Sequence, residues 1–362
     1  MTAPHVEREE LLQIIEAGID GPTGDNCQPW KVALREDGFD LWLVPEAAHS
    51  YFDLGDYASW LACGGFLENA RLAAAGRGLS ATWTIAPDPS QPTLWARVTL
   101  SPVSGLSRDE LASAIRDRHA NRSPFEPSPI SDSQARALES QGSEAGKVVV
   151  VHDPTRLKKL RELVAFGERV RARSREAHES TRPWFRWTAA QAETSRDGLD
   201  ARVLGISAGQ RVALRALQPW SLMWLSGCLG GARMMGHYAG ALIERAGGVG
   251  VVASRSLCPA DVVAAGQALE RAWLRATLDG LGFSVLGALT LFALRVEEGK
   301  GGEFPARDQE SLKAASGELR ALFGLRAPER ALVLFRVGRA PRPALVSLRR
   351  PVASFLQQGG AP

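Results

Sequence analysis

The sequence predicts an α+β protein built from two related halves in one chain. Three observations support this prediction. Helical and extended patterns alternate in both halves, 362 residues exceed what one hydrophobic core usually fills, and a segment of the first half recurs in the second. Hydrophobic residues make up 45% of the chain and charged residues 23%, which excludes fibrous and disordered classes.

The first half alternates between helix and strand. A helical stripe over residues 7–17 ends at the pair Gly21-Pro22. Alternating apolar residues over 30–44 predict two strands around the turn REDGFD. A helical pattern returns over 54–78, and residues 93–102 predict a further strand.

A segment rich in Pro, Ser and charge, residues 117–134, separates the two halves, which we place at 1–117 and 118–362. In the second half we expect a strand at 148–151, a basic helix at 156–177, a strand at 247–254, a helix at 260–278, an apolar run at 284–296, a loop at 297–308 and a strand at 330–339. We also expect this half to include a lid-like helical region at about 196–246 and a C-terminal tail.

The recurring segment is helical. GGFLENARLAAAGRGL, which starts at Gly64, aligns with GQALERAWLRATLDGL, which starts at Gly266, and the pairs Gly64/Gly266 and Glu68/Glu270 are among the identical positions. Helices rich in Ala and Leu also match by chance, which is the alternative reading. The repeat predicts one long central helix in each half that ends at a glycine.

Composition limits the classes of partner and the compartment. The net charge is only +3, and the excess of Arg over Lys reflects base composition, so we expect no nucleic-acid partner. The four cysteines show no CxxC and no regular spacing, so the sequence indicates neither a disulfide framework nor a zinc site and fits a reducing compartment. The first residues lack a signal-peptide pattern, so we expect a cytoplasmic protein.

The most apolar stretch, residues 221–243, carries Arg233 and His237. A membrane span does not readily accept an arginine at its centre. We therefore predict a buried or lid-forming helical region here, and no membrane partner.

Side chains typical of hydrolytic or metal catalysis are missing from the sequence. It contains no phosphate-binding GxxxxGK[ST] loop, and its histidines are scattered. We therefore predict no catalytic side chain and no metal. What remains are the amides of Asn26 and Gln28 and two arginine clusters, at 118–122 and 336–351.

These residue types suit a flavin. The pyrimidine edge of an isoalloxazine ring offers carbonyl acceptors and an N–H donor, which amides can meet, and its phosphate tail needs guanidinium groups. Each arginine cluster considered alone is equally consistent with a solvated loop. Cys27 lies inside the amide loop, but without a second cysteine nearby we interpret it as a packing residue, and we interpret Trp30 as a core residue.

Four stretches resemble the FMN-dependent nitroreductase superfamily. GPTGDNCQPWKV is similar to its Pro-Ser-x-x-Asn-x-Gln-Pro-Trp loop, and RHANRSPF to its Arg-Arg-Ser-x-Arg-x-Phe phosphate motif. GGFLENARLAAAGRGL is similar to its central helix, and RVGRAPRPALVSLRRPV to its C-terminal segment. The resemblance implies a nitroreductase-like fold, in which each half has a mixed or antiparallel sheet flanked by helices.

The order of these motifs is unusual, because the amide loop precedes the arginine motif. That order resembles the double-length branch of the superfamily, in which one chain mimics the homodimer and holds one flavin. The resemblance therefore implies a monomer that acts as an internal pseudo-dimer.

The resemblance also implies the site residues. Asn26 and Gln28 would contact the flavin ring or ribityl chain, Pro29 would fix the loop, and the phosphate would be bound by arginines, namely Arg118 and Arg122 with help from Arg349 or Arg350. The chain departs from the motif at His119 and at Ala120, where the superfamily has Arg and Ser. The segment RDGLD from Arg196 resembles the superfamily's Glu-Gly-Phe-Asp segment, but its place in the chain order differs and we assign it no role.

The implied function is an FMN oxidoreductase. Two-electron (hydride) transfer would pass through flavin N5 from NADH or NADPH to a small acceptor such as a nitroaromatic, a quinone or an unsaturated compound. The alternative is an FMN-binding protein for storage or redox sensing, with residues 220–243 as a lid and little NAD(P)H turnover. A third possibility is an interaction scaffold without flavin.

Overall fold

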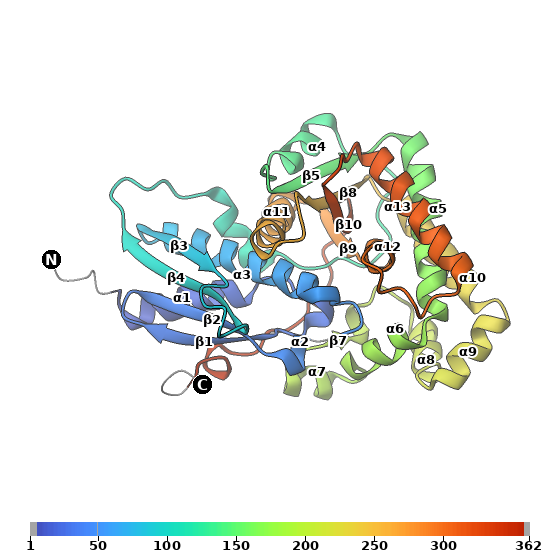
Figure 1. Cartoon of the computed structure of the whole chain (residues 1–362), viewed down its shortest axis with the longest axis horizontal. Coiled ribbons are helices and arrows are strands. Elements are labelled where there is room, and N and C mark those ends of the chain that lie inside the picture. Colours follow the sequence, from blue (N-terminus) through green and yellow to red (C-terminus); the bar gives the residue numbers. More distant parts are fainter. Residues whose placement is uncertain (1–5, 49, 358–362) are drawn as a thin grey trace.

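The computed structural model describes residues 6–48 and 50–357. Two four-stranded sheets lie on either side of a pair of central helices (Figure 1). The first sheet has the order β1-β2-β4-β3, and every neighbouring pair in it is antiparallel. Its strands are β1 (Trp30–Arg35), β2 (Gly38–Leu43), β3 (Leu79–Ile85) and β4 (Leu94–Pro102).

The second sheet repeats this arrangement. Its order is β5-β8-β10-β9, and its neighbours are again all antiparallel. Its strands are β5 (Gly146–Val151), β8 (Gly248–Ser254), β9 (Gly282–Leu286) and β10 (Arg330–Gly338). In each sheet the fourth strand in sequence lies between the second and the third, so the two sheets share one topology.

The central helices cross at a pair of glycines. The helices are α3 (Tyr57–Ala75) and α11 (Pro259–Leu278). A Cβ atom on Gly64 would lie 2.1 Å from the carbonyl oxygen of Val263, and one on Gly266 would lie 2.2 Å from that of Leu61. Leu61 and Val263 occupy equivalent positions in the repeat, so the contact is reciprocal, as at a two-fold interface. Glycine is required at both positions because the backbones touch.

The halves differ most between their first two strands. A tight turn at Glu36-Asp37 joins β1 to β2, whereas six α-helices separate β5 from β8 and extend along the right and lower edges of the molecule in Figure 1. These helices are α5 (Pro154–Arg173), α6 (Arg175–Thr181), α7 (Ala189–Ser195), α8 (Ala208–Ala216), α9 (Trp220–Cys228) and α10 (Gly231–Glu244). The short strands β6 (Phe185–Arg186) and β7 (Leu199–Asp200) pair in parallel within this insertion.

Local sequence signals explain where several helices begin. Ser131 and Gln134 form a capping box at the start of α4, and the Asp153 carboxylate accepts the N–H of Arg156 at the start of α5. The remaining α-helices are α1 (Arg8–Ile19), α2 (Pro45–Ala48), α4 (Asp132–Glu139), α12 (Ala288–Glu297) and α13 (Ala306–Phe323).

The C-terminal tail returns from the second half to the first. At the edge of β1, the N–H of Val32 donates to the oxygen of Phe355 at 2.9 Å, and the N–H of Gln357 donates to the oxygen of Val32 at 2.9 Å. The buried Phe355 ring packs against Trp30, a core residue as predicted. This path carries Arg349 and Arg350 past the loop between α1 and β1.

The predicted α+β class with antiparallel sheets is confirmed. The single helix expected over 156–177 is divided, because Ser174 is extended and its hydroxyl caps α6 through the N–H of Ala177. The apolar run 284–296 covers the end of β9 and most of α12, since burial on all sides removes the periodicity that distinguishes strand from helix. Strand β3 and helix α13 were not predicted.

Candidate functional site

The loop between α1 and β1 has an unusual backbone. The angle φ is positive at Asp25 (47°), Asn26 (57°) and Gln28 (50°), none of which is glycine. Such conformations cost free energy and persist where the surrounding structure enforces them, often at functional sites. Pro29 follows directly, and its carbonyl oxygen accepts the N–H of Val44 at 2.9 Å, which anchors the end of the loop to the sheet.

The C-terminal tail enforces the loop conformation through both predicted amides. Asn26 Nδ2 donates to the Leu348 oxygen at 3.0 Å, while Arg349 Nη1 donates to Asn26 Oδ1 at 2.7 Å. The side-chain oxygen Oε1 of Gln28 accepts the backbone N–H of Arg350 at 2.9 Å. The guanidinium of Arg350 donates to the backbone carbonyl oxygen of Gln28 at 2.8 Å. Gln28 is fully buried, so its side chain is enclosed by protein.

A third segment closes this junction. Gln28 Nε2 donates to the Arg196 oxygen at 2.9 Å, and the N–H of Gly198 donates to the Asn26 oxygen at 3.2 Å. Arg196 Nε also donates to the Arg349 oxygen at 2.7 Å. Gly198 has a φ of 71°, and a Cβ atom there would lie 2.4 Å from the Trp184 oxygen, so this position requires glycine.

Sequence reasoning left the segment from Arg196 without a role because of its place in the chain order. The structure brings it against the amide loop, since the insertion between β5 and β8 returns to the first half. The RDGLD motif itself was the signal that could have found it. Chain order does not restrict which segments meet in space once a long insertion is present.

Arg118 lies in the interior beside a carboxylate that the site prediction did not include. Its Nε is 3.0 Å from Glu270 Oε1, and both side chains are almost completely buried. Its guanidinium also donates to the Asp20 oxygen and lies over the ring of Trp273. Burial raises the pKa of Glu270 to about 7, against the opposing effect of Arg118. The identity with Glu68 in the repeat was the signal for Glu270.

Arg349 shares this environment. Burial lowers the pKa of Arg349 to about 10, and the nearby positive charges of Arg118 and Arg122 act in the same direction, while Asp20 and Glu270 oppose them. Its buried Nε has no hydrogen-bond partner within the described part of the chain. The guanidinium groups of Arg118, Arg122 and Arg349 therefore lie near one another. The carboxyl groups of Asp20 and Glu270 lie close to Arg349.

Arg122 is the least constrained of the predicted arginines. The loop at Gly205 covers its backbone, where a Cβ atom on that glycine would lie 2.6 Å from the Arg122 carbonyl carbon. Among residues 6–48 and 50–357, its guanidinium has no hydrogen bond or ion pair. Burial lowers its pKa and raises that of Asp25, and the two opposite charges partly offset these shifts. The positive charge of Arg171, which pairs with Glu168 at 2.8 Å, also opposes the effect of burial on the pKa of Asp25.

The predicted site residues thus gather at one junction, with Arg118 and Arg349 close in space and Arg349 and Arg350 bonded to the amide loop. Cys27 in this loop is not a thiolate, because burial raises its pKa to about 12, which fits a packing role. In the part of the chain that the structure describes, no group of three or more His, Cys, Asp or Glu side chains could hold a metal ion.

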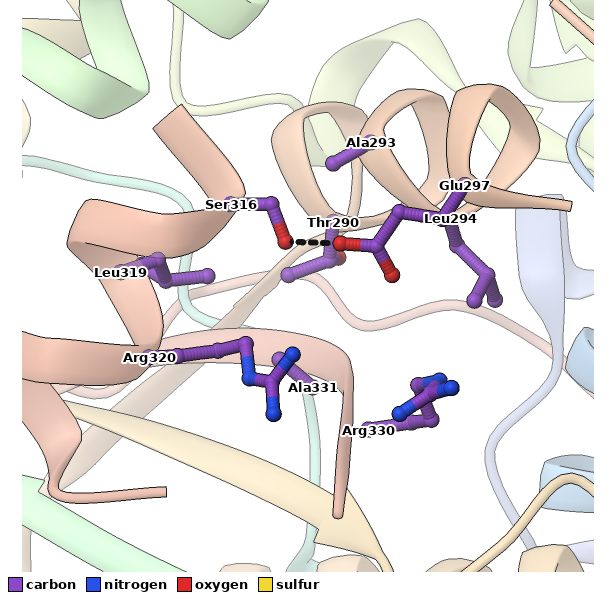
Figure 2. A pocket seen from close by; sticks show the side chains of 9 residues that line it. All are labelled: Thr290, Ala293, Leu294, Glu297, Ser316, Leu319, Arg320, Arg330 and Ala331. Carbon is purple, nitrogen blue, oxygen red and sulfur yellow. Dashed lines mark hydrogen bonds between the residues drawn. The ribbon is translucent and has the colours of Figure 1, made fainter. Parts of the chain in front are cut away.

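A cavity of about 10 Å³ lies elsewhere, between α12 and α13 (Figure 2). Glu297 accepts a hydrogen bond from Ser316 there, and Arg320 and Arg330 border the same space. This volume holds about one water molecule, so it excludes an organic ligand. A shallow surface depression of about 620 Å³ lies closer to the junction and is lined by residues between Pro183 and Ser195.

Comparison with known proteins gives distant similarity. No family model matches the chain. It is 25% identical to an uncharacterised protein, MT1398, from Mycobacterium tuberculosis, over 96% of this chain and 48% of that protein, so it spans about half the length of this curated relative. An identity of 25% does not establish a family.

Two of the solved structures with some similarity to the chain are nitroreductases. The nitroreductase NfnB from Mycobacterium smegmatis, in complex with NADPH, is 18% identical, with coverage of 69% of this chain and 99% of that one and a TM-score of 0.40. A nitroreductase with bound FMN from Bacteroides fragilis is 12% identical, with coverage of 67% and 94% and a TM-score of 0.36.

Proposed function

We propose that the chain is an FMN-binding oxidoreductase of the nitroreductase type. The observation that supports it is the meeting of three segments that are distant in sequence: the loop 23–29, Arg118 with Arg122, and Arg349 with Arg350. These are the segments whose motifs resemble the superfamily. A solvated loop, the alternative for each arginine cluster, does not fit Arg118, whose side chain is 3% exposed.

The residues present fit a phosphate group. Arg118, Arg122 and Arg349 carry three positive charges, and the carboxyl groups that act on them are those of Asp20, Asp25 and Glu270. Because Glu270 is partly neutral near pH 7, the junction has an excess of buried positive charge, which an anion would compensate. The buried, unpartnered Nε of Arg349 is a donor that such an anion would satisfy.

Roles within the proposed site follow from which donors are already occupied. Gln28 has both ends of its amide bonded to protein, so we assign it to positioning the loop and the tail, in place of the direct flavin contact expected from the resemblance. Asn26 keeps one free N–H, and Arg122 keeps its whole guanidinium, so these two are assigned to the flavin. Pro29 fixes the end of the loop.

The chemistry belongs to the cofactor. Bound FMN would supply two-electron (hydride) transfer through N5, with NADH or NADPH as the donor and a nitroaromatic, a quinone or an unsaturated compound as the acceptor. The chain holds the phosphate with guanidinium groups, fixes the ring edge and excludes water beneath the insertion. No side chain needs to act as an acid or a base. We also propose that residues 1–117 and 118–362 form a monomer that mimics a dimer.

The second candidate function is FMN storage or redox sensing. The loop at Gly205 covers Arg122, and the hydroxyl of Tyr238 on α10 donates to the Gly205 oxygen at 3.5 Å, so the insertion can act as a lid. Mixing the yellow protein with NADPH and an acceptor separates the two functions. Rapid bleaching near 450 nm followed by turnover supports the oxidoreductase, and flavin that neither NADH nor NADPH reduces supports storage.

Flavin titration tests the site itself. Arg349→Gln should weaken FMN binding by at least tenfold, because a charge-assisted hydrogen bond contributes about 1.5–3 kcal/mol. Arg342→Gln is the matched control, since that arginine lies in the same tail but is exposed and pairs with Asp117 at 2.6 Å. A protein that binds no FMN, or an Arg349→Gln variant that binds it as tightly as the original, would remove the proposal.

A further inference from the structure

The insertion carries a concentration of exposed apolar side chains. Ten large apolar residues are exposed in the part of the chain that the structure describes, and six of them lie within residues 208–244. They are Val212, Leu222, Trp224, Leu225, Leu229 and Met234, which we call the apolar patch. Clusters of this kind on a water-exposed surface usually mark an interaction site.

Helix α9 has its apolar face turned outward. Leu222, Leu225 and Leu229 recur at spacings of three and four residues, so they share one face, and Leu229 is 81% exposed. On the inner side Met223 is buried against Ala172 and Ala232. In Figure 1, α8 and α9 lie at the lower right edge of the molecule, away from both sheets. In the part of the chain that the structure describes, this outer face is open to solvent.

The charged residues on the segment that carries the apolar patch are mostly basic. Residues 201–243 include four arginines and no Asp or Glu. Arg211, Arg215 and Arg233 form no ion pair with any described residue. Arg233 also lies close enough to Arg169 on α5 to lower the pKa of that arginine, together with burial and Arg173. The occupant of this surface must therefore tolerate an apolar contact and supply negative charge.

We propose that α8, α9 and α10 dock on an anionic lipid bilayer, with α9 lying in the plane of the interface. The leucines of α9 enter the acyl boundary, and the arginines meet anionic headgroups. A second copy of the chain does not fit this face, because two copies would bring unpaired arginines together without a carboxylate.

This proposal replaces the expectation that the protein has no membrane partner. Arg233 does not fit the centre of a membrane span, and no helix of the described residues has the length and apolarity to cross a bilayer. A helix that lies in the interface keeps its arginines in water, so the same residues are compatible with docking. The inference is independent of the proposed function and is tested without flavin.

Vesicle sedimentation tests the proposal on the full chain. The protein should pellet with vesicles of phosphatidylcholine containing phosphatidylglycerol, and little should pellet with phosphatidylcholine alone. High salt should weaken the binding. The double variant Leu225→Ser/Leu229→Ser should lose at least tenfold in vesicle affinity, and Arg211→Gln/Arg215→Gln should lose about fivefold for each arginine removed.

Val103→Ser/Leu106→Ser is the matched control, because these side chains are 40% and 39% exposed but lie in the first half, and it should bind vesicles like the original protein. Thermal unfolding without vesicles should be similar for all these variants, which separates docking from folding. Absence of pelleting with anionic vesicles overturns the proposal. So does dimerisation in solution that Leu225→Ser/Leu229→Ser abolishes, since a second copy would then be the occupant.

Discussion

The connections between the first helix and the first strand of each half occupy the same place in one topology, yet they have different structures. The loop after α1 has three non-glycine residues with positive φ and is bonded to the tail and to residues 196–198. Residues 140–145 after α4 have no positive φ. They form a local turn, in which the N–H of Ser143 donates to the Gly146 carbonyl oxygen at 2.7 Å. The first loop is shaped mainly by distant segments. The second is shaped mainly by its own turn, with one distant bond from the N–H of Arg255 to the Ala145 oxygen at 2.9 Å.

The same contrast appears at the paired glutamates of the central helices. Glu68 on α3 is bonded to Arg71 at 2.6 Å, to Arg271 at 2.9 Å and to Gln267 at 3.0 Å. Glu270 on α11 faces Arg118 and is completely buried. The two halves thus share a framework, but the polar residues that fit a ligand gather at one of the two equivalent positions.

The largest effect on stability is expected where the buried pair of Arg118 and Glu270 is broken. Arg118→Ala should destabilise the protein by about 3–5 kcal/mol, because it leaves the Glu270 carboxyl buried without its partner. The neutral form of Glu270 contributes stability below its unfolded pKa of 4.5, and this contribution is lost as the pH rises through about 7. Without Arg118 the folded pKa rises further, so the loss measured by urea unfolding should be greater at pH 8 than at pH 6.

Arg71→Ala is the control in the other half. Arg71 is 34% exposed, and its removal leaves Glu68 with two partners, so the expected change is below about 1 kcal/mol. The double variant Arg118→Ala/Glu270→Gln should recover most of the stability. Equal losses in Arg118→Ala and Arg71→Ala would contradict the difference between the two glutamates.

The next largest effect on stability is expected at the reciprocal contact of Gly64 and Gly266. Gly64→Ala and Gly266→Ala should each destabilise by about 1–3 kcal/mol, because a methyl group at either position meets backbone of the other helix. Gly317→Ala in α13 is the control, since a Cβ atom there has no neighbour within 4 Å, and it should be neutral or stabilising. Thermal unfolding measures all three. A large loss for one central glycine and none for the other would show that the crossing is not symmetric.

The sequence predicted the features that depend on local pattern or on the repeat. Alternating apolar residues predicted β1 and β2, and the repeat predicted two central helices, whose final glycines, Gly78 and Gly280, have φ of 73° and 69°. The packing of Gly64 on Gly266 could not be predicted, because it depends on how two helices distant in sequence cross.

The resemblance selected Asn26, Gln28 and the arginines that meet at the junction, but it did not indicate which of their hydrogen bonds the protein uses itself. The burial of Gln28 depends on the tail and on Arg196, which lie 322 and 168 residues away. Glu270 was missed as a site residue for the same reason, since its pairing with Arg118 follows from tertiary packing. Local patterns contain no information about such distant partners.

A smaller effect on stability is expected from the different hydrogen bonding of the two loops. Gln28→Ala should destabilise by about 1–2 kcal/mol, because it leaves the Arg196 oxygen and the Arg350 N–H without their partner. It should also speed hydrogen exchange of the tail amides. Gln141→Ala, in the second loop, removes a bond to the Ala137 oxygen of the same helix and should change stability by less than about 0.5 kcal/mol. Similar losses in both variants would mean that the tail does not depend on the first loop.

The smallest effect concerns the pH dependence of FMN binding. Ionised Glu270 competes with the phosphate for Arg118, and burial raises its pKa to about 7. FMN affinity should therefore fall several-fold between pH 6.5 and pH 8, even though the phosphate, with a second pKa near 6, gains negative charge over this range. Glu270→Gln should abolish the fall, whereas Glu68→Gln should preserve it, because Glu68 is held by its own partners. Riboflavin, which lacks the phosphate, should bind equally at both pH values. A fall that persists in Glu270→Gln would assign the titration to another group.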